Sequence, residues 1–539
     1  MRKGTHVGRR AAIVAGALAA LTALLLTTAA TAAPGKRQNV IIGYAGSDAN
    51  ARALVSKYGG SVNHAFPQIN AVAASLDEAS VGQIKRETGV QYVENDAPRA
   101  ANGLSSLSNT QLVPLSSNGL YGLVMTNEYP APFGYTGAGA MACVADTGID
   151  VNHPDIKANF LGGYDAIDLD NSPDVGNDIH EQHATHVSGT IAGVNNNKGV
   201  VGGAPGNGFL EARVLHWDGT NNTGETSQVM AGAQWLSDHG CRVINMSLGG
   251  GDKSKAEEAL YDNLFKNGAG GKGTLIVASA GNDSAKAISY PAGYTNILSV
   301  AALNPDGSLA SFSNHGAGLD ISAPGVDVAS SVPTGTGHDA AVGNIVAPEA
   351  LSAEFAGSTS SSGITGTLVD CGLAVAATDC PASVAGNIAV ISRGSVSFAQ
   401  KVENAMARGA AAAVIYNNVA GTLNATLGTE TTSTGKAWIP VVTVPQARGA
   451  ELVSRAGSTT TVFSIPTSWD YFSGTSMAAP HVTAAAALVL QANPRLTPAQ
   501  VASILTSTAT DLGTKNYDTT FGNGLVNAKA AVQKALATP

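Results

Sequence analysis

The sequence predicts an α/β fold, a parallel β-sheet with helices packed on it, preceded by a small α+β domain and interrupted by an insert. From about residue 119, short apolar strands alternate with helices, which is the pattern of a parallel sheet. Residues 39–95 show the order β-α-β-β-α-β, the ferredoxin-like arrangement. From 334 to 467 the composition shifts to Ala, Gly, Thr and Ser, which indicates an independent domain. A chain of 539 residues has room for these domains.

The N-terminal domain is predicted element by element from its hydrophobic periodicity. Strands are expected at residues 39–44, 61–66, 69–76 and 90–93, and helices at 49–58 and 77–88. Residues 100–118 follow and are rich in Ser and Asn, a composition typical of a linker that a protease can reach.

In the main domain, polar residues follow the predicted strands. A strand at residues 140–145 runs into Asp146, one at 243–250 ends in glycines, and one at 275–280 runs into Gly281 and Asn282. The carboxyl ends of parallel strands are the usual place of a functional site. The α/β pattern resumes at Trp469 after the insert and includes a helix at 497–507. Within the insert, strands are expected at 388–391, 411–416 and 440–444, and a helix at 397–408.

Composition and charge exclude some functions. Charged residues make up 13% of the chain, and the formal charge of −9 is spread without long runs. Average proteins have roughly 25% charged residues. Neither nucleic acid nor an anionic membrane is therefore expected as a partner.

The first 33 residues are predicted to be a signal peptide. Basic residues up to Arg10 precede an apolar stretch at 11–26 and small residues with an A-x-A site that ends at Ala32. The apolar stretch is short for a membrane-spanning helix, so cleavage is favoured over an N-terminal anchor. The pair Arg9-Arg10 leaves twin-arginine export open beside the general route. We expect a secreted protein with no membrane attachment after cleavage.

Four cysteines, an even number, suit an oxidising compartment. Cys371 and Cys380 lie close together in sequence, and we expect a disulfide that closes a short loop. Cys143 and Cys241 each open a predicted buried strand. For this second pair, two core thiols and a bridge between neighbouring strands are both compatible with the sequence.

The stretch from Gly474 to His481 is predicted to be a loop that turns into a helix. Small residues around Ser476 let the backbone and a substrate come close, and Ser476 falls where the first free N–H groups of the helix point. Pro480 is expected in the first turn, ahead of an alanine-rich run typical of a fully buried helix. The alternative is an ordinary helix start with a capping serine.

His183 is the candidate base, since a histidine at the start of a small-residue helix can present its imidazole at the surface of a packed core. A metal site competes with this interpretation because four metal-binding side chains are close in sequence: His180, Glu181, His183 and His186. Their spacing is not that of H-E-x-x-H, so a metal is disfavoured here. We expect His186 to be a hydrogen-bonded core histidine.

Acyl transfer from a serine needs a base, a carboxylate that holds the base in the right tautomer, and donors for the developing oxyanion. The chain offers these groups as His183, Asp146, Asn282 and the nucleophile Ser476. Each residue alone is a weak signal. Together, the chain order Asp, His, Ser is one of three orders known in unrelated serine peptidases.

With these motifs the chain resembles the subtilases, subtilisin-like serine endopeptidases, over residues of about 119–333 and 468–530. Four motifs carry the resemblance: residues 144–150, 183–189, 280–282 and 474–480. The resemblance implies a seven-stranded parallel sheet with helices on both faces. It also implies that Asp146 orients the base, His183 is general base and then acid, Ser476 is the nucleophile, and Asn282 stabilises the oxyanion together with the Ser476 N–H.

The resemblance implies two binding segments as well. Ser247-Leu248-Gly249 is similar to the substrate-binding edge strand, which pairs with an extended peptide by strand addition. Residues 195–205 resemble the strong calcium loop. Its expected ligands are Asp155, the Asn196 side chain, and the carbonyls of Val194, Lys198 and Val200. A plain Asn/Gly turn is the alternative.

The domains follow from the resemblance: a signal peptide (1–33), an inhibitor-type propeptide (34–99), a linker or processing region (100–118), a catalytic domain (119–333 and 468–539) and an insert (334–467). Such a propeptide is a folding aid and an intramolecular inhibitor that the enzyme itself removes. The insert resembles a protease-associated (PA) domain, mainly of β-structure.

Three positions depart from the family pattern. Ala184 and Ser188 replace the usual Gly and Ala near the histidine, and Ala184 would be strained if it had to take a positive φ. Glu225 stands where an aromatic residue is common in the outer substrate pocket. The side-chain preference of the enzyme therefore cannot be taken from the family.

We expect a secreted, monomeric serine endopeptidase that acts on proteins or peptides, contains structural calcium and is processed from a proenzyme. Two alternatives are a catalytically silent subtilase that binds a partner, and an adhesion module built on the insert. Peptide ligation instead of hydrolysis would use the same residues.

Overall fold

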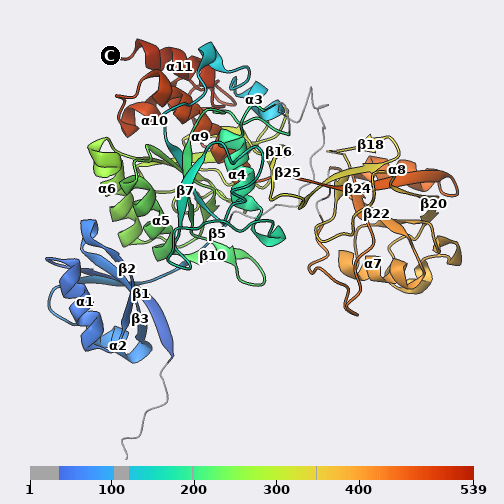
Figure 1. Cartoon of the computed structure of the whole chain (residues 1–539), viewed down its shortest axis with the longest axis horizontal. Coiled ribbons are helices and arrows are strands. Elements are labelled where there is room, and N and C mark those ends of the chain that lie inside the picture. The colour runs from blue at the N-terminus through green and yellow to red at the C-terminus, as the bar shows by residue number, and fades with distance from the viewer. Residues whose placement is uncertain (1–35, 102–119, 197–198, 348, 422, 424) are drawn as a thin grey trace, which may run out of the picture.

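The computed structural model of the chain describes residues 36–101, 120–196, 199–347, 349–421, 423 and 425–539. The predicted signal peptide and most of the expected linker at 100–118 lie outside the described residues. Figure 1 shows three bodies: a small N-terminal domain, a central α/β domain that also holds the C-terminus, and the insert at its side.

The N-terminal domain has the predicted β-α-β-β-α-β order. Its antiparallel sheet has the strand order β2-β3-β1-β4, with β1 (Arg37–Tyr44), β2 (Ser61–Phe66), β3 (Ala71–Asp77) and β4 (Val90–Asn95). The helices α1 (Asp48–Lys57) and α2 (Glu78–Ile84) share a core with Val40 and Ile42 of β1. Ile41, which lies between these two residues, is buried with the side chains of the central domain instead. The domain therefore has its own core. It packs on the central domain through the face of its sheet that its own helices leave uncovered.

The central domain is built on a seven-stranded parallel sheet of order β15-β14-β13-β11-β6-β8-β7, as predicted. Its strands are β6 (Ala142–Asp146), β7 (Phe160–Asp165), β8 (Phe209–Arg213), β11 (Val243–Met246), β13 (Leu275–Ser279), β14 (Ile297–Leu303) and β15 (Ile321–Pro324). The strands are buried almost throughout, as a sheet covered on both faces requires.

Helices cover both faces of this sheet. One core joins the sheet to α4 (His183–Ala192), α9 (Thr475–Ala492), α10 (Pro498–Ser507) and α11 (Ala528–Ala537). The other joins it to α5 (Thr226–Asp238) and α6 (Lys255–Gly271). The two cores use alternate residues of β6, with Val144 in the first and Cys143 in the second. A short helix, α3 (Tyr121–Met125), precedes the sheet.

The insert leaves and re-enters the central domain through two paired strands, β16 (Val328–Ser331) and β25 (Trp469–Phe472). Its eight-stranded sheet has the order β18-β17-β24-β20-β21-β22-β23-β19. These strands are β17 (Gly337–Val342), β18 (Ile345–Val346), β19 (Leu351–Ser352), β20 (Ile364–Asp370), β21 (Ile388–Ser392), β22 (Ala412–Tyr416), β23 (Val441–Val444) and β24 (Thr459–Thr467). The helices are α7 (Phe398–Ala407) and α8 (Gln446–Ser454), so the predicted β-rich insert is confirmed.

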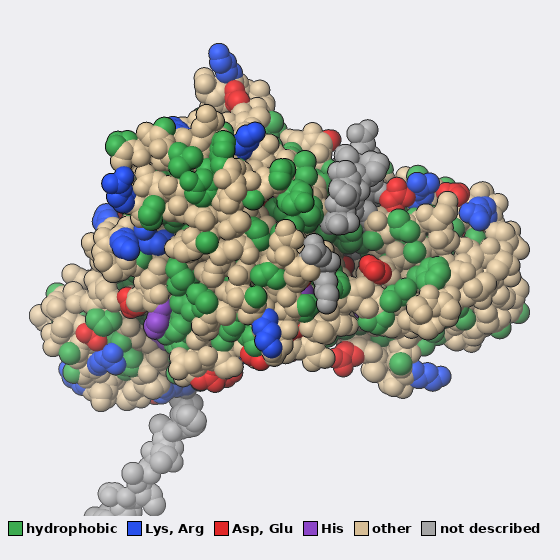
Figure 2. All heavy atoms as spheres, turned by 45° about the horizontal axis from the view of Figure 1, so that its top comes forward, with side chains coloured by type: hydrophobic (Ala, Val, Ile, Leu, Met, Phe, Trp, Pro, Cys, Tyr) green, Lys and Arg blue, Asp and Glu red, His purple; other side chains and the backbone are tan. Residues whose placement is uncertain are grey.

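Charged side chains are scattered over the face shown in Figure 2 and form no large patch of one sign. No helix among the described residues is both long enough and apolar enough to cross a membrane.

Both cysteine pairs form disulfides. The expected short loop is closed by Cys371 and Cys380. Cys143 of β6 is bonded to Cys241, just before β11, which is the bridged one of the two alternatives left open by the sequence. The bond joins neighbouring strands inside the second core of the central domain.

We expect the two disulfides to differ in their effect on stability. The Cys143–Cys241 bond closes a loop of 98 residues and the Cys371–Cys380 bond one of 9. Cross-linking a longer loop removes more entropy from the unfolded chain. The double variant Cys143→Ala/Cys241→Ala should lose about 2–4 kcal/mol, seen as a lower Tm in calorimetry at a fixed scan rate. Cys371→Ala/Cys380→Ala is the control, and an equal or larger drop in its Tm would contradict the argument.

Candidate active site

An aspartate and a histidine meet at the carboxyl edge of the central sheet. Asp146 is the last residue of β6, and His183 is the first residue of α4. Asp146 Oδ1 lies 2.6 Å from His183 Nδ1 and also accepts the Thr147 N–H at 2.7 Å. Both side chains are buried, and among the described residues His183 Nε2 has no hydrogen-bond partner. The carboxylate can therefore hold the imidazole with Nε2 as the proton-accepting nitrogen.

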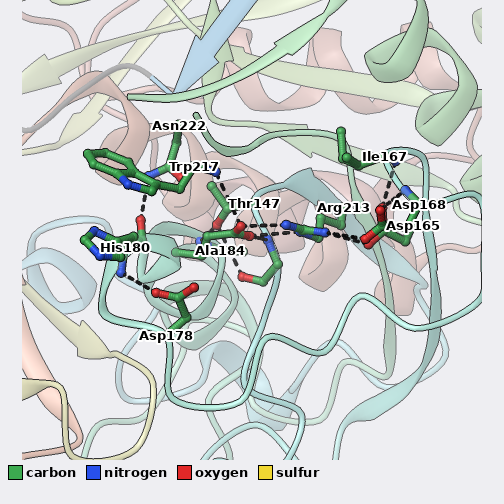
Figure 3. Close-up of polar contacts among 12 residues, drawn as sticks. Thr147, Asp165, Ile167, Asp168, Asp178, His180, Ala184, Arg213, Trp217 and Asn222 are labelled. Carbon is green, nitrogen blue, oxygen red and sulfur yellow. Dashed lines mark hydrogen bonds and ion pairs between the residues drawn. The ribbon is translucent and has the colours of Figure 1, made fainter. Parts of the chain in front are cut away.

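The turn before His183 is tied to the sheet by an ion pair (Figure 3). Arg213 of β8 lies opposite Asp146 in the strand register, and its guanidinium donates twice to the Glu181 carboxylate, at 2.6 and 2.9 Å. Glu181 also accepts the Gly148 N–H at 2.9 Å. The Glu181 carboxylate thus links the segment just before His183 to the segment just after Asp146. This link fixes the distance between His183 and Asp146.

The two departures near His183 have a structural account. Ala184 lies in α4 with a negative φ, so the strain that a positive φ would cause does not arise. Its N–H donates to Thr147 Oγ1 at 3.0 Å. The Ser188 hydroxyl donates to Glu211 at 3.5 Å. Burial, with the Asp146 charge nearby, raises the pKa of Glu211 well above its ordinary value.

His186 is a hydrogen-bonded core histidine, as expected. Its Nε2 lies 3.0 Å from the Val328 carbonyl oxygen, and its ring stacks on Phe472 with 4.4 Å between centroids. Burial lowers the pKa of His186 to about 3, which keeps the ring neutral. Among the described residues no group of three or more His, Cys, Asp or Glu side chains has an arrangement suited to a metal ion.

Ser476 is the second residue of α9, and it is doubly linked to Ser247. The Ser476 hydroxyl donates to the Ser247 carbonyl at 2.9 Å, and the Ser247 hydroxyl donates to the Ser476 carbonyl at 2.7 Å. The expectation that Pro480 lies in the first turn is wrong, because α9 begins at Thr475 and Pro480 falls in the second turn. A proline there cannot donate to the carbonyl four residues back. That carbonyl belongs to Ser476, and the Ser247 hydroxyl satisfies it instead.

Asn282 is oriented by Thr475, the residue before the candidate nucleophile. Asn282 Oδ1 accepts both the Thr475 N–H and the Thr475 hydroxyl, each at 2.9 Å. Since the amide oxygen is engaged on this side, the group that Asn282 can offer to an oxyanion is its NH₂. The role of Thr475 was not predicted from the sequence, and only the spatial proximity of two distant motifs reveals it.

A strand of the N-terminal region lies along the expected substrate edge. A four-stranded sheet has the order β12-β5-β10-β9, with β5 (Pro98–Ala101), β9 (His216–Trp217), β10 (Asn222–Glu225) and β12 (Leu248–Gly249). Ala101 pairs with Leu248 and Ala100 with Gly249, both antiparallel. The chain's own segment thus pairs with the edge strand in the way that strand addition requires.

The residues expected to bind calcium do not fit that ion as they are arranged. The Asp155 carboxylate accepts bonds from four donors: Trp469 Nε1 at 2.6 Å, Asn196 Nδ2 at 2.9 Å, Val200 N at 3.2 Å and Ser331 Oγ at 3.4 Å. Three of these donors lie at Oδ2, and Asn196 lies at Oδ1. Asn196 turns its NH₂ toward Asp155, and the Val194 carbonyl accepts the Asn196 N–H at 3.0 Å. Lys198 lies outside the described residues.

The fold and the site together support peptide-bond hydrolysis by a serine, which puts the chain among the serine endopeptidases. Comparison with known proteins identifies the particular group. The model of the subtilase family matches residues 137–344, and the PA domain matches residues 364–452. Subtilisin E of Bacillus subtilis (strain 168) is 34% identical over 294 residues, which cover 54% of this chain and 71% of that protein. The chain therefore belongs to the subtilase family.

Other relatives agree with this assignment. The alkaline protease of Shouchella clausii is 33% identical over 345 residues, covering 60% of this chain and 82% of that enzyme. The psychrophilic subtilisin-like protease Apa1 from an Antarctic Pseudoalteromonas has a TM-score of 0.56 at 28% identity, covering 78% of this chain and 99% of that chain. Fervidolysin from Fervidobacterium pennivorans is similar in fold, with a TM-score of 0.60 at 23% identity over 93% of this chain and 61% of that chain.

Because Trp469, Asn196 and two other protein donors already hold the Asp155 carboxylate, we expect a chelator to leave the Tm unchanged. Trp469→Phe should lower the Tm, since it removes a hydrogen bond to a buried carboxylate, which contributes about 1.5–3 kcal/mol. Calorimetry with and without chelator measures both effects. Trp235→Phe is the control, because the Trp235 ring stacks on Tyr164 and His239 outside this site. A clear drop in Tm on chelation would contradict this view and restore Asp155 and Asn196 as calcium ligands.

Proposed function

We propose that the chain is an exported peptidase that hydrolyses peptide bonds in proteins with Ser476 as nucleophile, His183 as base and Asp146 as its orienting carboxylate. The observation that carries the proposal is the 2.6 Å contact between Asp146 and His183, whose Nε2 is left to accept a proton. The proposal includes no calcium ion, because the donors around Asp155 do not suit one.

The proposed reaction is that of a serine peptidase. The Ser476 hydroxyl leaves its bond to the Ser247 carbonyl, gives its proton to His183 Nε2, and attacks the carbonyl carbon of the substrate. The Ser476 N–H and the Asn282 amide stabilise the oxyanion. His183 then protonates the leaving amine, and a water molecule, activated by the same base, hydrolyses the acyl-enzyme. Asp146 keeps its charge throughout and stabilises the imidazolium.

The N-terminal domain is proposed to act as a propeptide, a folding aid and an inhibitor that the enzyme removes from itself. Two of its carboxylates cap helices of the central domain. Glu94 accepts bonds from Ser254 Oγ at 2.6 Å and from two N–H groups at the start of α6, each at 3.1 Å. Asp96 accepts the Ser227 N–H at the start of α5, at 2.8 Å. A carboxylate at a helix N-terminus is stabilising, so the contacts of Glu94 support a role in assembling α6.

Export is supported by the predicted signal peptide and by two disulfides, which suit an oxidising compartment. We assign the processing step to residues 100–118, which begin within β5.

Ser476→Ala tests the proposal directly. The variant should fold, retain the propeptide as one chain with the enzyme, and lose turnover by about 10⁶-fold. Mass spectrometry of the secreted protein reads out processing, and hydrolysis of an unfolded protein substrate reads out activity. Labelling of the wild type by a fluorophosphonate separates an enzyme from a silent relative. A processed and fully active Ser476→Ala protein would refute the assignment.

Release of the propeptide should accelerate as the pH rises. In the docked domain, burial beside Glu225 raises the pKa of Asp96 to about 7, from an ordinary value of 3.8. Docking therefore takes up a proton, so its stabilisation is complete below about pH 4 and is lost as the pH rises toward 7. The dissociation constant should increase by up to about tenfold per pH unit in that window.

The measurement is the delay before activity appears after processing, compared at pH 5 and pH 8. Asp96→Asn should remove most of the difference between these two delays, because it cannot ionise. The control is Asp77→Asn, an exposed aspartate on β3 of the same domain. An unchanged pH dependence in Asp96→Asn would show that another group controls release.

A further inference from the structure

Arg99, in the strand that lies along the substrate edge, has a side chain that is 0% exposed. It is the largest fully buried side chain among the described residues. Arginine is rarely buried without a partner, because removing its charge from water costs several kilocalories per mole. A buried guanidinium at this position therefore indicates a pocket built for it.

The partner is Glu257, whose side chain is also 0% exposed. Arg99 Nη2 donates to Glu257 Oε2 at 2.5 Å, and Arg99 Nε reaches Glu257 Oε1 at 3.4 Å. Nη2 also donates to the Asp252 carbonyl at 3.0 Å. A carboxylate and a carbonyl thus hold the guanidinium through hydrogen bonds, one of them charge-assisted. This arrangement selects both a positive charge and a particular orientation of the donor groups.

Every group that forms the pocket belongs to the central domain. Glu257 lies in the first turn of α6 and is held by two tyrosines, with Tyr294 Oη at 2.8 Å and Tyr261 Oη at 3.2 Å. Gly250 forms part of the wall, since a Cβ atom there would lie 3.0 Å from the Arg99 guanidinium and 2.9 Å from the Pro98 carbonyl. The pocket therefore stays with the enzyme when the propeptide leaves.

The strand register defines which substrate residue enters this pocket. Arg99 pairs with Gly224, Ala100 with Gly249, and Ala101 with Leu248. The next residue of the edge strand is Ser247, whose carbonyl is bonded to the Ser476 hydroxyl. In a peptide that takes the register of β5, the residue facing Ser247 is beside the nucleophile. The residue in the pocket comes three positions earlier.

We propose that this pocket makes the mature enzyme selective for arginine three residues before the residue that faces Ser247. The proposal rests on the function proposed above, and it identifies Glu257 as the residue that determines specificity. A substrate with an apolar residue at this position leaves a buried carboxylate without its cation, and one with glutamate adds a second negative charge. Lysine supplies the charge but lacks the planar fork that contacts both Glu257 and the Asp252 carbonyl.

The first test compares tetrapeptide anilides that differ only in their first residue, which is arginine, lysine, norleucine or glutamate. With the processed wild-type enzyme, kcat/KM should be about 10²-fold higher for arginine than for norleucine, with lysine between them and glutamate lowest. Equal values for arginine and norleucine, in an enzyme whose Ser476→Ala variant is inactive, would overturn the proposal and leave the function intact. Failure to cleave any peptide or unfolded protein would refute the proposed function itself.

The second test changes the pocket. Glu257→Gln should reduce the arginine preference at least tenfold, while Glu258→Gln should keep it. Glu258 is the neighbouring residue on α6, is 33% exposed, and pairs with Lys253 on the surface. Because Glu257→Gln also weakens the bond to Arg99 and can impair folding, the double variant Arg99→Leu/Glu257→Leu supplies an apolar pair in its place. This enzyme should prefer norleucine over arginine, and a retained arginine preference would overturn the proposal.

Discussion

The burial of α9 on all sides is the constraint on which the rest of the structure depends. From Thr475 to Leu490 every residue is buried, so the helix is surrounded by protein and has room only for small side chains near the sheet. The alanine-rich sequence meets this constraint. It also puts Ser476 at a fixed point, where the bond from the Ser247 hydroxyl replaces the one that Pro480 cannot make. The same hydrogen bond thus completes the helix and couples the nucleophile to the substrate edge.

The sequence alone predicts those parts of the fold and site that depend on local pattern. Three strands of the central sheet, the N-terminal domain and the insert follow from periodicity and composition. The seven-stranded sheet and the pairing of Asp146 with His183 follow from the resemblance to the subtilases. The sequence alone does not predict contacts between segments that are far apart in the chain. The hydrogen bond from Trp469 to Asp155 joins residues 314 positions apart, so a loop that resembles a calcium site is filled by an indole N–H. The choice between thiols and a disulfide at Cys143 likewise depended on which strand lies next to β6.

Docking of the N-terminal domain and recognition of substrate use the same surfaces. Glu94 and Asp96 cap α6 and α5, and two residues after Asp96 the chain begins β5, which pairs with the substrate edge strand. The helix that Glu94 caps is also the one that presents Glu257 in its first turn. In the proposed role of the N-terminal domain as a folding aid, assembly of this helix also shapes the pocket in which Arg99 lies, which would link folding of the enzyme to its later specificity.

The two tyrosines explain how the pocket can outlast the propeptide. A buried carboxylate that lost its only partner would take up a proton and cease to discriminate by charge. Glu257 keeps the hydroxyls of Tyr261 and Tyr294 after Arg99 leaves, and the Tyr294 hydroxyl is itself held by the Ser254 N–H at 2.9 Å. Opening the groove also admits water to the side that the guanidinium had filled. These donors keep the carboxylate oriented for the next cation.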